Sequence, residues 1–141
     1  MYQIKSESDK KNTLKWLSNF NKELEAIMKV DIPEEVKLAQ ANSFKSLIFQ
    51  LEQQLEEYEN LKKGNFKLPD EVTFSDLLGY LIKIRISKGI SQSELARKLG
   101  VSKQQISRYE EHEYQGANIA RIHKILEVLN VKVSIKLQNV A

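Results

Sequence analysis

The N-terminal half of the chain carries apolar residues at the spacing of amphipathic helices. They recur every three or four positions from about Ser8 to Met28, and again from about Pro33 to Lys63 with a period of about 3.5 residues. Pro33 disfavours helix at the residue before it and suits a new first turn, so we expect two helices. Their predicted seams are Leu14, Leu17, Phe20, Leu24 and Ile27, and then Ala41, Phe44, Ile48, Leu51, Leu55 and Tyr58.

These two helices need a partner for their seams. A lone helix would leave its apolar stripe in water, at a cost of about 1.5–3 kcal/mol per large side chain. One interpretation is a purely structural antiparallel hairpin. The other is an arm for dimerisation or partner binding, which is favoured because Leu47, Phe49 and Leu61 widen the apolar surface beyond the strict seam. The sequence leaves open whether the helices pack within one chain or between two.

A turn signal at Lys63-Gly64-Asn65 separates this hairpin from a second region. Residues 64–73 read as a linker. Residues 74–130 then show four short helical patterns, with Thr73, Ser91 and Ser102 placed as N-caps of the first three. We therefore predict a compact helical domain over 74–130.

The last stretch changes its period from helical to alternating. Val131, Val133, Ile135 and Leu137 alternate with polar residues, which predicts a short β-strand in a terminal segment over 131–141. A lone strand leaves its backbone groups unpaired. Pairing with the same strand of a second subunit would satisfy them, and the alternatives are a strand lying on its own domain or a disordered tail. The predicted fold class is mainly α, with a hairpin over 1–63.

Composition and charge narrow the function. The chain has no cysteine, which excludes a disulfide scaffold, thiol catalysis and cysteine-ligated zinc. Its apolar runs are too short for a membrane helix, and its first residues lack the apolar core of a secretory signal, so we expect a cytoplasmic protein. The net charge of +3 arises wholly in residues 64–141, which suits a nucleic-acid partner.

Nothing in the sequence indicates catalysis. His112 and His123 are isolated, and no phosphate-cradling glycine loop, nucleophile elbow or zinc spacing occurs. We therefore expect no enzymatic activity, no catalytic residue, no metal and no cofactor.

The informative stretch is Gln92 to Glu110, because each position has a physical task. Ala96 is small where the next helix crosses at close range, and Gly100 can take the positive φ that a tight turn between helices requires. Ser102 then caps a helix whose positive end points outward. Long or polar donors occupy the exposed first turns of that helix and suit base edges and phosphates: Lys103, Gln104, Ser107 and Arg108.

These residues give the chain a family resemblance. Residues 74–130 resemble the helix-turn-helix domain of the lambda-type phage repressors and Cro proteins, also called xenobiotic-response-element-type regulators. The pattern that carries the resemblance is Gln92, Leu95-Ala96, Gly100-Val101, Ile106 and Tyr109-Glu110.

The resemblance implies a role for several positions. Gln92 is expected to open the second helix and bind a phosphate, while Arg85 and Glu110 are expected to form a buried structural ion pair. The loop 111–116 departs from the family by its extra negative charge, so backbone contacts there are assigned to Asn118 and Arg121. The expected DNA-binding set is Gln92, Ser102, Lys103, Gln104, Ser107, Arg108, Asn118 and Arg121.

Three functions compete. The leading hypothesis is a sequence-specific repressor that binds double-stranded DNA as a homodimer, on a palindrome with half-sites about 34 Å apart or a multiple of it. The layout also resembles antitoxins of toxin–antitoxin operons, so the alternative is an antitoxin whose hairpin covers a toxin and whose DNA binding is autoregulation. The third is a coiled-coil adaptor that has lost DNA binding, against which the retained Lys103, Gln104 and Arg108 argue.

Overall fold

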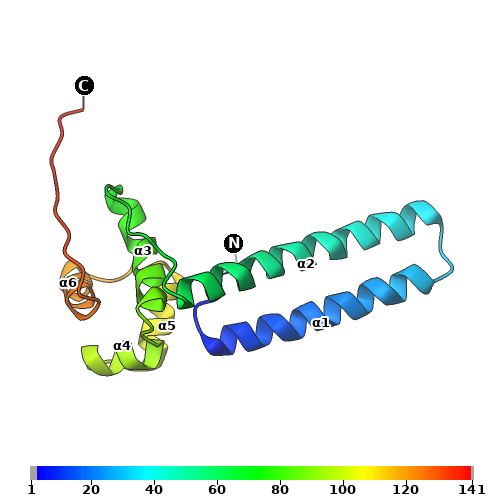
Figure 1. The fold of residues 1–141 in the computed structure, drawn as a ribbon, viewed down its shortest axis with the longest axis horizontal. Coiled ribbons are helices and arrows are strands. Elements are labelled where there is room, and N and C mark those ends of the chain that lie inside the picture. Colours follow the sequence, from blue (N-terminus) through cyan, green and yellow to red (C-terminus); the bar gives the residue numbers. More distant parts are fainter. Residues whose placement is uncertain (1–2, 141) are drawn as a thin grey trace. The chain divides into compact units, whose positions relative to one another are not determined.

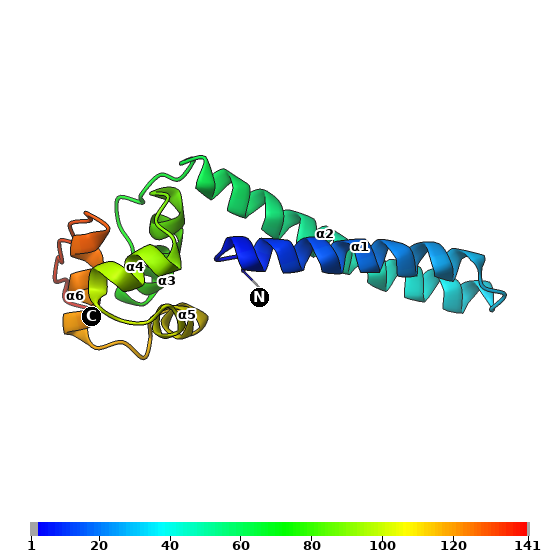
Figure 2. The same cartoon turned by 90° about the horizontal axis from the view of Figure 1, so that it is seen from below.

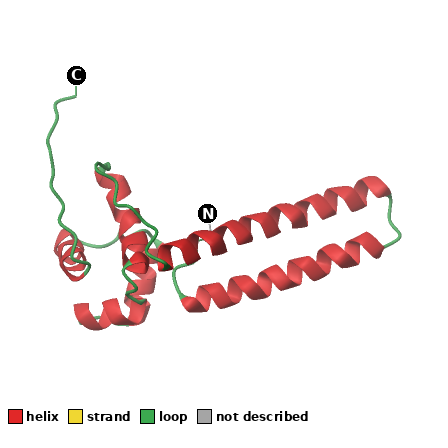
Figure 3. Cartoon of the chain, in the orientation of Figure 1, coloured by secondary structure: helices red, strands yellow, loops and turns green. Residues whose placement is uncertain are grey.

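The computed structural model describes residues 3–140, which contain six helices and no strand. The chain divides into two compact units, Met1–Asn65 and Phe66–Ala141. Figure 3 shows helices joined by loops in both units. No helix within residues 3–140 is both long and apolar enough to cross a membrane.

The first unit is a hairpin of two long helices, α1 (Glu7–Lys29) and α2 (Glu34–Lys62), which run antiparallel (Figure 1). Ser6 caps α1, because its side-chain oxygen accepts a hydrogen bond from the backbone N–H of Asp9 at 3.1 Å. Pro33 stands directly before α2, as its fixed φ and missing N–H favour. Both helices match the ranges that the apolar pattern predicts.

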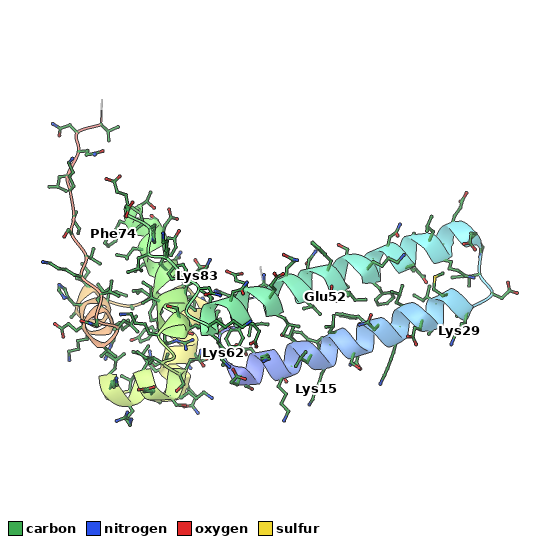
Figure 4. All side chains as sticks on the ribbon, in the orientation of Figure 1. Lys15, Lys29, Glu52, Lys62, Phe74 and Lys83 are labelled. Atoms are coloured by element: carbon green, nitrogen blue, oxygen red, sulfur yellow. The ribbon has the colours of Figure 1, made fainter. Side chains whose placement is uncertain are left out.

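Most of the predicted seam is at least partly buried between the two helices, but Leu14, its first member, is 47% exposed. The rings of Phe20 and Phe44 meet with centroids 6.1 Å apart, and Ala41 and Ile48 are buried. Of the flanking apolar residues, Leu61 is buried, whereas Leu47 is 41% and Phe49 61% exposed. Figure 4 shows Lys15 pointing away from α2, as expected for the solvent side of α1.

The open end of the hairpin is held by polar contacts that the apolar pattern does not reveal. Tyr58 donates its hydroxyl proton to Glu7 at 3.0 Å, and Lys62 pairs with the same Glu7 oxygen at 2.5 Å. A second ion pair joins Lys10 to Glu59. These contacts tie the start of α1 to the last turns of α2.

The second unit is built from four helices, shown from another side in Figure 2. They are α3 (Phe74–Ser87), α4 (Gln92–Leu99), α5 (Lys103–Glu111) and α6 (Ile119–Val128). Thr73 caps α3 by accepting from the backbone N–H of Asp76 at 3.1 Å, and its hydroxyl donates to the carboxylate of Asp76 at 2.7 Å. The preceding connector belongs to this unit, because the ring of Phe66 lies 6.0 Å from that of Tyr80.

The expected C-terminal strand is not formed. Residues 131–140 contain neither strand nor helix and leave the end of α6 as an extended trace (Figure 1). The prediction of a strand within the single chain is therefore wrong. The physical reason is that a strand needs a second edge for its backbone hydrogen bonds, and the described residues supply none.

Candidate nucleic-acid interface

A tight corner joins α4 to α5. Gly100 ends α4 in the left-handed conformation, with φ 70° and ψ 31°, and the N–H of Val101 donates back to the carbonyl of Ala96 at 3.0 Å. Ser102 then starts α5 by accepting a hydrogen bond from the backbone N–H of Gln105 at 3.1 Å. Glycine is favoured at residue 100 because a Cβ is strained at this φ.

A small apolar core fixes the angle between these two helices. Leu95 and Ile106 are fully buried and Ala96 is 3% exposed, so α5 crosses α4 where the side chain is a single methyl group. The partly buried residues packed on this core are Ile90, Leu99, Val101, Tyr109 and Val128. The corner is therefore rigid, and it directs one face of α5 outward.

That outward face carries four residues of the expected DNA-binding set. Lys103, Gln104, Ser107 and Arg108 are all exposed, whereas Ile106 and Glu110 on the opposite face are buried. The first turn of α5 contains no acidic residue. Its unpaired N–H groups and the Lys103 charge therefore give this helix end a positive potential.

A buried carboxylate anchors the inner face of α5. Glu110 is fully buried, and its two oxygens accept from Arg85 of α3, from Nε at 2.5 Å and from Nη2 at 2.9 Å. Arg85 also donates from Nη1 to the carbonyl of Ile90 at 2.8 Å. Arg85 and Glu110, which the family resemblance pairs, therefore form a bidentate ion pair between α3 and α5 in this structure.

Two further donors complete this cluster. Gln92 donates from Nε2 to Glu110 at 2.9 Å, and Tyr114 donates its hydroxyl proton to the same carboxylate at 3.3 Å. Tyr114 is fully buried, and burial together with the Glu110 charge raises its pKa far above the usual value of 10.0. Four elements of the unit thus meet at one carboxylate.

Gln92 differs here from its expected role at a phosphate. Its side chain is only 6% exposed, and its amide donor faces Glu110. The reason is that a buried carboxylate needs several donors, and Gln92 at the start of α4 is within reach. The exposed first turn of α4 retains its backbone N–H groups for an anion.

Tyr114 is the residue that sequence reasoning missed. It lies in a polar loop that reads as solvent-exposed, and only its spacing of four residues from Glu110 hints at a contact. Its backbone takes a φ of 60°, and that of Glu113 a φ of 50°, which are unfavourable for residues with a Cβ. The buried ring and its hydrogen bond offset this backbone cost.

The start of α6 lies beyond this loop. Asn118 caps α6 by accepting from the backbone N–H of Arg121 at 2.8 Å, and the Arg121 guanidinium lies 3.5 Å from the carbonyl of Leu99. Asn118 is exposed and Arg121 is half-buried. Both residues therefore have structural contacts in addition to any contact with a phosphate.

The arrangement of α4, the corner at Gly100 and α5 is that of a helix-turn-helix unit. A comparison with protein families agrees, since residues 81–135 match the family described as Helix-turn-helix. The match supports a lambda repressor/Cro-like helix-turn-helix domain over these residues, of the kind found in DNA-binding transcriptional regulators. This family is generally non-enzymatic. Searches of curated proteins and of solved structures returned no match.

Proposed function

We propose that this protein is a sequence-specific repressor that binds a palindromic operator as a dimer, with α5 as the recognition helix. The observation that carries the proposal is the exposed face of α5, where Lys103, Gln104 and Arg108 stand on a helix whose other face is anchored by Glu110. A helix with its N-terminal residues free is the element that enters the major groove in this class.

The chemistry of these side chains supports base reading. Arg and Lys donate to the O6 and N7 of guanine, and Gln forms a bidentate pair with adenine. Lys103 and Gln104 lie in the first turn of α5, and Arg108 follows one turn later on the exposed face. Ser107 is short enough to contact either a base edge or a phosphate.

Phosphate contacts would come from the helix starts around α5. Ser102 and Asn118 are exposed caps, and α4 presents backbone N–H groups beside Gln92. Arg121 adds a charge at the start of α6. Such contacts fix the register of the protein on the duplex, while the α5 side chains select the sequence.

A dimer is proposed because one small domain contacts too few base pairs. Two linked units convert the second binding event into an intramolecular one, which raises the overall affinity. A twofold dimer places its recognition helices about 34 Å apart, or a multiple of that, and this fixes the half-site spacing.

Selection from a random DNA pool tests this function. The full chain should recover a palindrome of two half-sites, and titration of the recovered site should give an affinity that falls steeply with salt, because several phosphates are neutralised. Recovery of no common sequence, with equal affinity for all oligonucleotides, would contradict base reading by α5. An affinity that does not respond to salt would favour the adaptor hypothesis instead.

A second function is favoured by the surface of the hairpin. Trp16, Leu38, Leu47 and Phe49 are all more than 40% exposed on α1 and α2. These exposed apolar side chains are ones that a bound partner could cover. They support an antitoxin whose hairpin covers a toxin while the second unit binds the operator.

Co-expression with the product of a neighbouring open reading frame tests this second function. The full chain should retain that product on an affinity column, and the Phe49→Lys variant should lose it while keeping DNA affinity. Lys15→Glu, on the solvent side of α1, serves as the matched control. Equal retention by all three chains would place the contact elsewhere.

A further inference from the structure

The segment after α6 leaves the surface of its own unit step by step. The exposed fraction rises from 38% at Val133 to 71% at Ile135 and 91% at Leu137. Val131 still donates its backbone N–H to Leu126 at 2.9 Å, whereas no backbone N–H from 132–140 has a backbone partner within the described residues. The unit therefore covers only the beginning of an alternating segment.

A groove of about 570 Å³ runs beside this segment. Its walls include Leu68, Val72 and Phe74 on one side, and Val133 and Ile135 on the other. All five of these side chains are more than a third exposed. Figure 4 shows Phe74 at the beginning of α3, at one end of this helix. Much of the apolar surface that the second unit leaves in water is thus gathered around one groove.

We propose that the groove is filled by the C-terminal segment of a second copy of this chain. Residues 131–139 of the two copies would pair as a two-stranded antiparallel sheet about a twofold axis, which satisfies the unpaired backbone groups of both. The same pairing covers Ile135 and Leu137 in each copy. The inference deepens the proposed function, because it names the surface that makes the DNA-binding unit a dimer.

The charges on the polar face select the register. If Ser134 stood on the twofold axis, Lys132 of each copy would lie opposite Lys136 of the other, and like charges directly opposite are unfavourable. With Ile135 on the axis, Lys136 lies opposite Ser134, Lys132 opposite Gln138, and Val133 opposite Leu137. A shift that pairs apolar with polar positions would send half of the apolar residues to the wrong face.

An axis at Val133 is less favourable than one at Ile135. It would place Leu137 opposite Leu129, which caps α6, and would bring Asn130 with its φ of 54° into the strand. The axis at Ile135 uses only residues beyond the helix end. We therefore place Ile135 opposite its own copy.

The chain contains no cysteine, so a single introduced thiol reports this register directly. In Ile135→Cys the two Cα atoms would lie about 4.5–5.5 Å apart, which a disulfide spans, and mild oxidation should give a covalent dimer. In the matched variant Ser134→Cys the two Cα atoms would lie more than about 7 Å apart, and crosslinking should be slow. If only Ser134→Cys crosslinks fast, the register is wrong. If neither variant crosslinks, the pairing itself is wrong.

Sedimentation equilibrium of the full chain tests the dimer itself. Ile135→Lys should raise the dissociation constant of the dimer about tenfold or more, because it places two like charges on the axis. Val140→Lys lies outside the paired residues and should leave the constant unchanged. Both side chains are more than two thirds exposed, so neither change should disturb folding. A monomeric parent chain, or an Ile135→Lys dimer as tight as the parent, refutes the pairing.

These outcomes are separate from those of DNA binding. A chain that dimerises through residue 135 but binds no DNA would remove the proposed function and leave the pairing intact. If the parent chain binds its operator and the Ile135→Lys variant remains dimeric, the pairing is refuted and the proposed function stands.

Discussion

Arg85 of α3 and Glu110 of α5 form a bidentate ion pair, and neither side chain is more than 3% exposed. The pair lies on the inner face of the proposed recognition helix, at its C-terminal end, where Glu110 is the last residue but one. It fixes α5 to α3 while the outer face of α5 stays open. The residues proposed to select a base and the residue that anchors the helix thus lie on opposite faces of α5.

Removing one partner of this pair should destabilise the second unit strongly. Glu110→Ala leaves the Arg85 guanidinium buried without its carboxylate, and the unfolding free energy should fall by about 3–5 kcal/mol. Urea unfolding followed by circular dichroism measures the change. Glu111→Ala removes an exposed neighbour and should alter stability by less than about 0.5 kcal/mol. Equal effects of the two changes would mean that the ion pair has no special role.

The unfolding free energy should fall at alkaline pH because of Tyr114. Its pKa in the folded chain is raised by burial and by Glu110 above the usual 10.0, so the unfolded chain loses this proton first. Stability is therefore complete below about pH 10 and falls above it, by about 1.4 kcal/mol for each further pH unit until the folded pKa is reached.

Tyr114→Phe tests this dependence. The variant should lose about 1 kcal/mol at pH 7, because a hydrogen bond to a buried carboxylate is removed. Its unfolding free energy should then fall less steeply than that of the parent between pH 10 and pH 11. Parallel curves for the two chains in that range would exclude Tyr114 as the titrating group.

Gly100 should tolerate alanine less well than Gly116 does. No atom lies within 4 Å of a Cβ at either position, so the two sites differ in the backbone alone, with φ at +70° for Gly100. Gly100→Ala should cost about 1–2 kcal/mol through left-handed strain. Gly116→Ala should be neutral or slightly stabilising, since alanine restricts the unfolded chain. Thermal unfolding of both variants gives the comparison.

The polar contacts at the open end of the hairpin should weaken in acid. The hydrogen bond from Lys62, followed by that from Tyr58, lowers the pKa of Glu7 below its usual 4.5, and Lys10 lowers that of Glu59. These groups stabilise the folded hairpin above about pH 4.5, and the contribution is lost as pH falls through their folded pKa values. Because the pairs are exposed, each contributes at most about 1 kcal/mol.

Fluorescence of Trp16, the single tryptophan, reports this hairpin. Glu7→Gln should lower the urea midpoint at pH 7 slightly, and the difference from the parent should shrink in acid and at high salt. Glu25→Gln, on an exposed part of α1, is the control and should leave the midpoint unchanged. A Glu7→Gln effect that persists in acid would point to packing instead of charge.

Arg108 should contribute to the preference for a DNA sequence without contributing to the stability of the folded chain. Arg108→Ala should weaken the selected site by about 1–3 kcal/mol and relax the preference at one base pair, because Arg108 is exposed on α5 and is proposed to donate to a base. Arg97→Ala, on the exposed side of α4, should at most weaken all sequences alike. A uniform loss for Arg108→Ala as well would make it a phosphate contact only.

The sequence by itself determined the helices and the corner between α4 and α5. Local signals suffice for these: the seam of Ala41, Phe44 and Ile48 follows a helical period, Ser91 and Ser102 are typical N-cap residues, and Gly100 favours the left-handed turn. The residues exposed on α5 follow from the same periodicity. Each of these depends on neighbours within a few positions along the chain, which is the range that a sequence pattern describes.

Only the tertiary structure decided the contacts between distant residues. The Gln92 side chain points inward to Glu110, and Tyr114 is buried although it belongs to a polar loop. Residues 131–140 form no strand. Each outcome depends on which groups meet in space: a buried carboxylate draws every donor within reach, and a strand forms only where a second edge supplies its hydrogen bonds. The alternation in residues 131–137 indicates that this segment can pair as a β-strand. Whether it does so within one chain depends on whether the fold places another strand beside it.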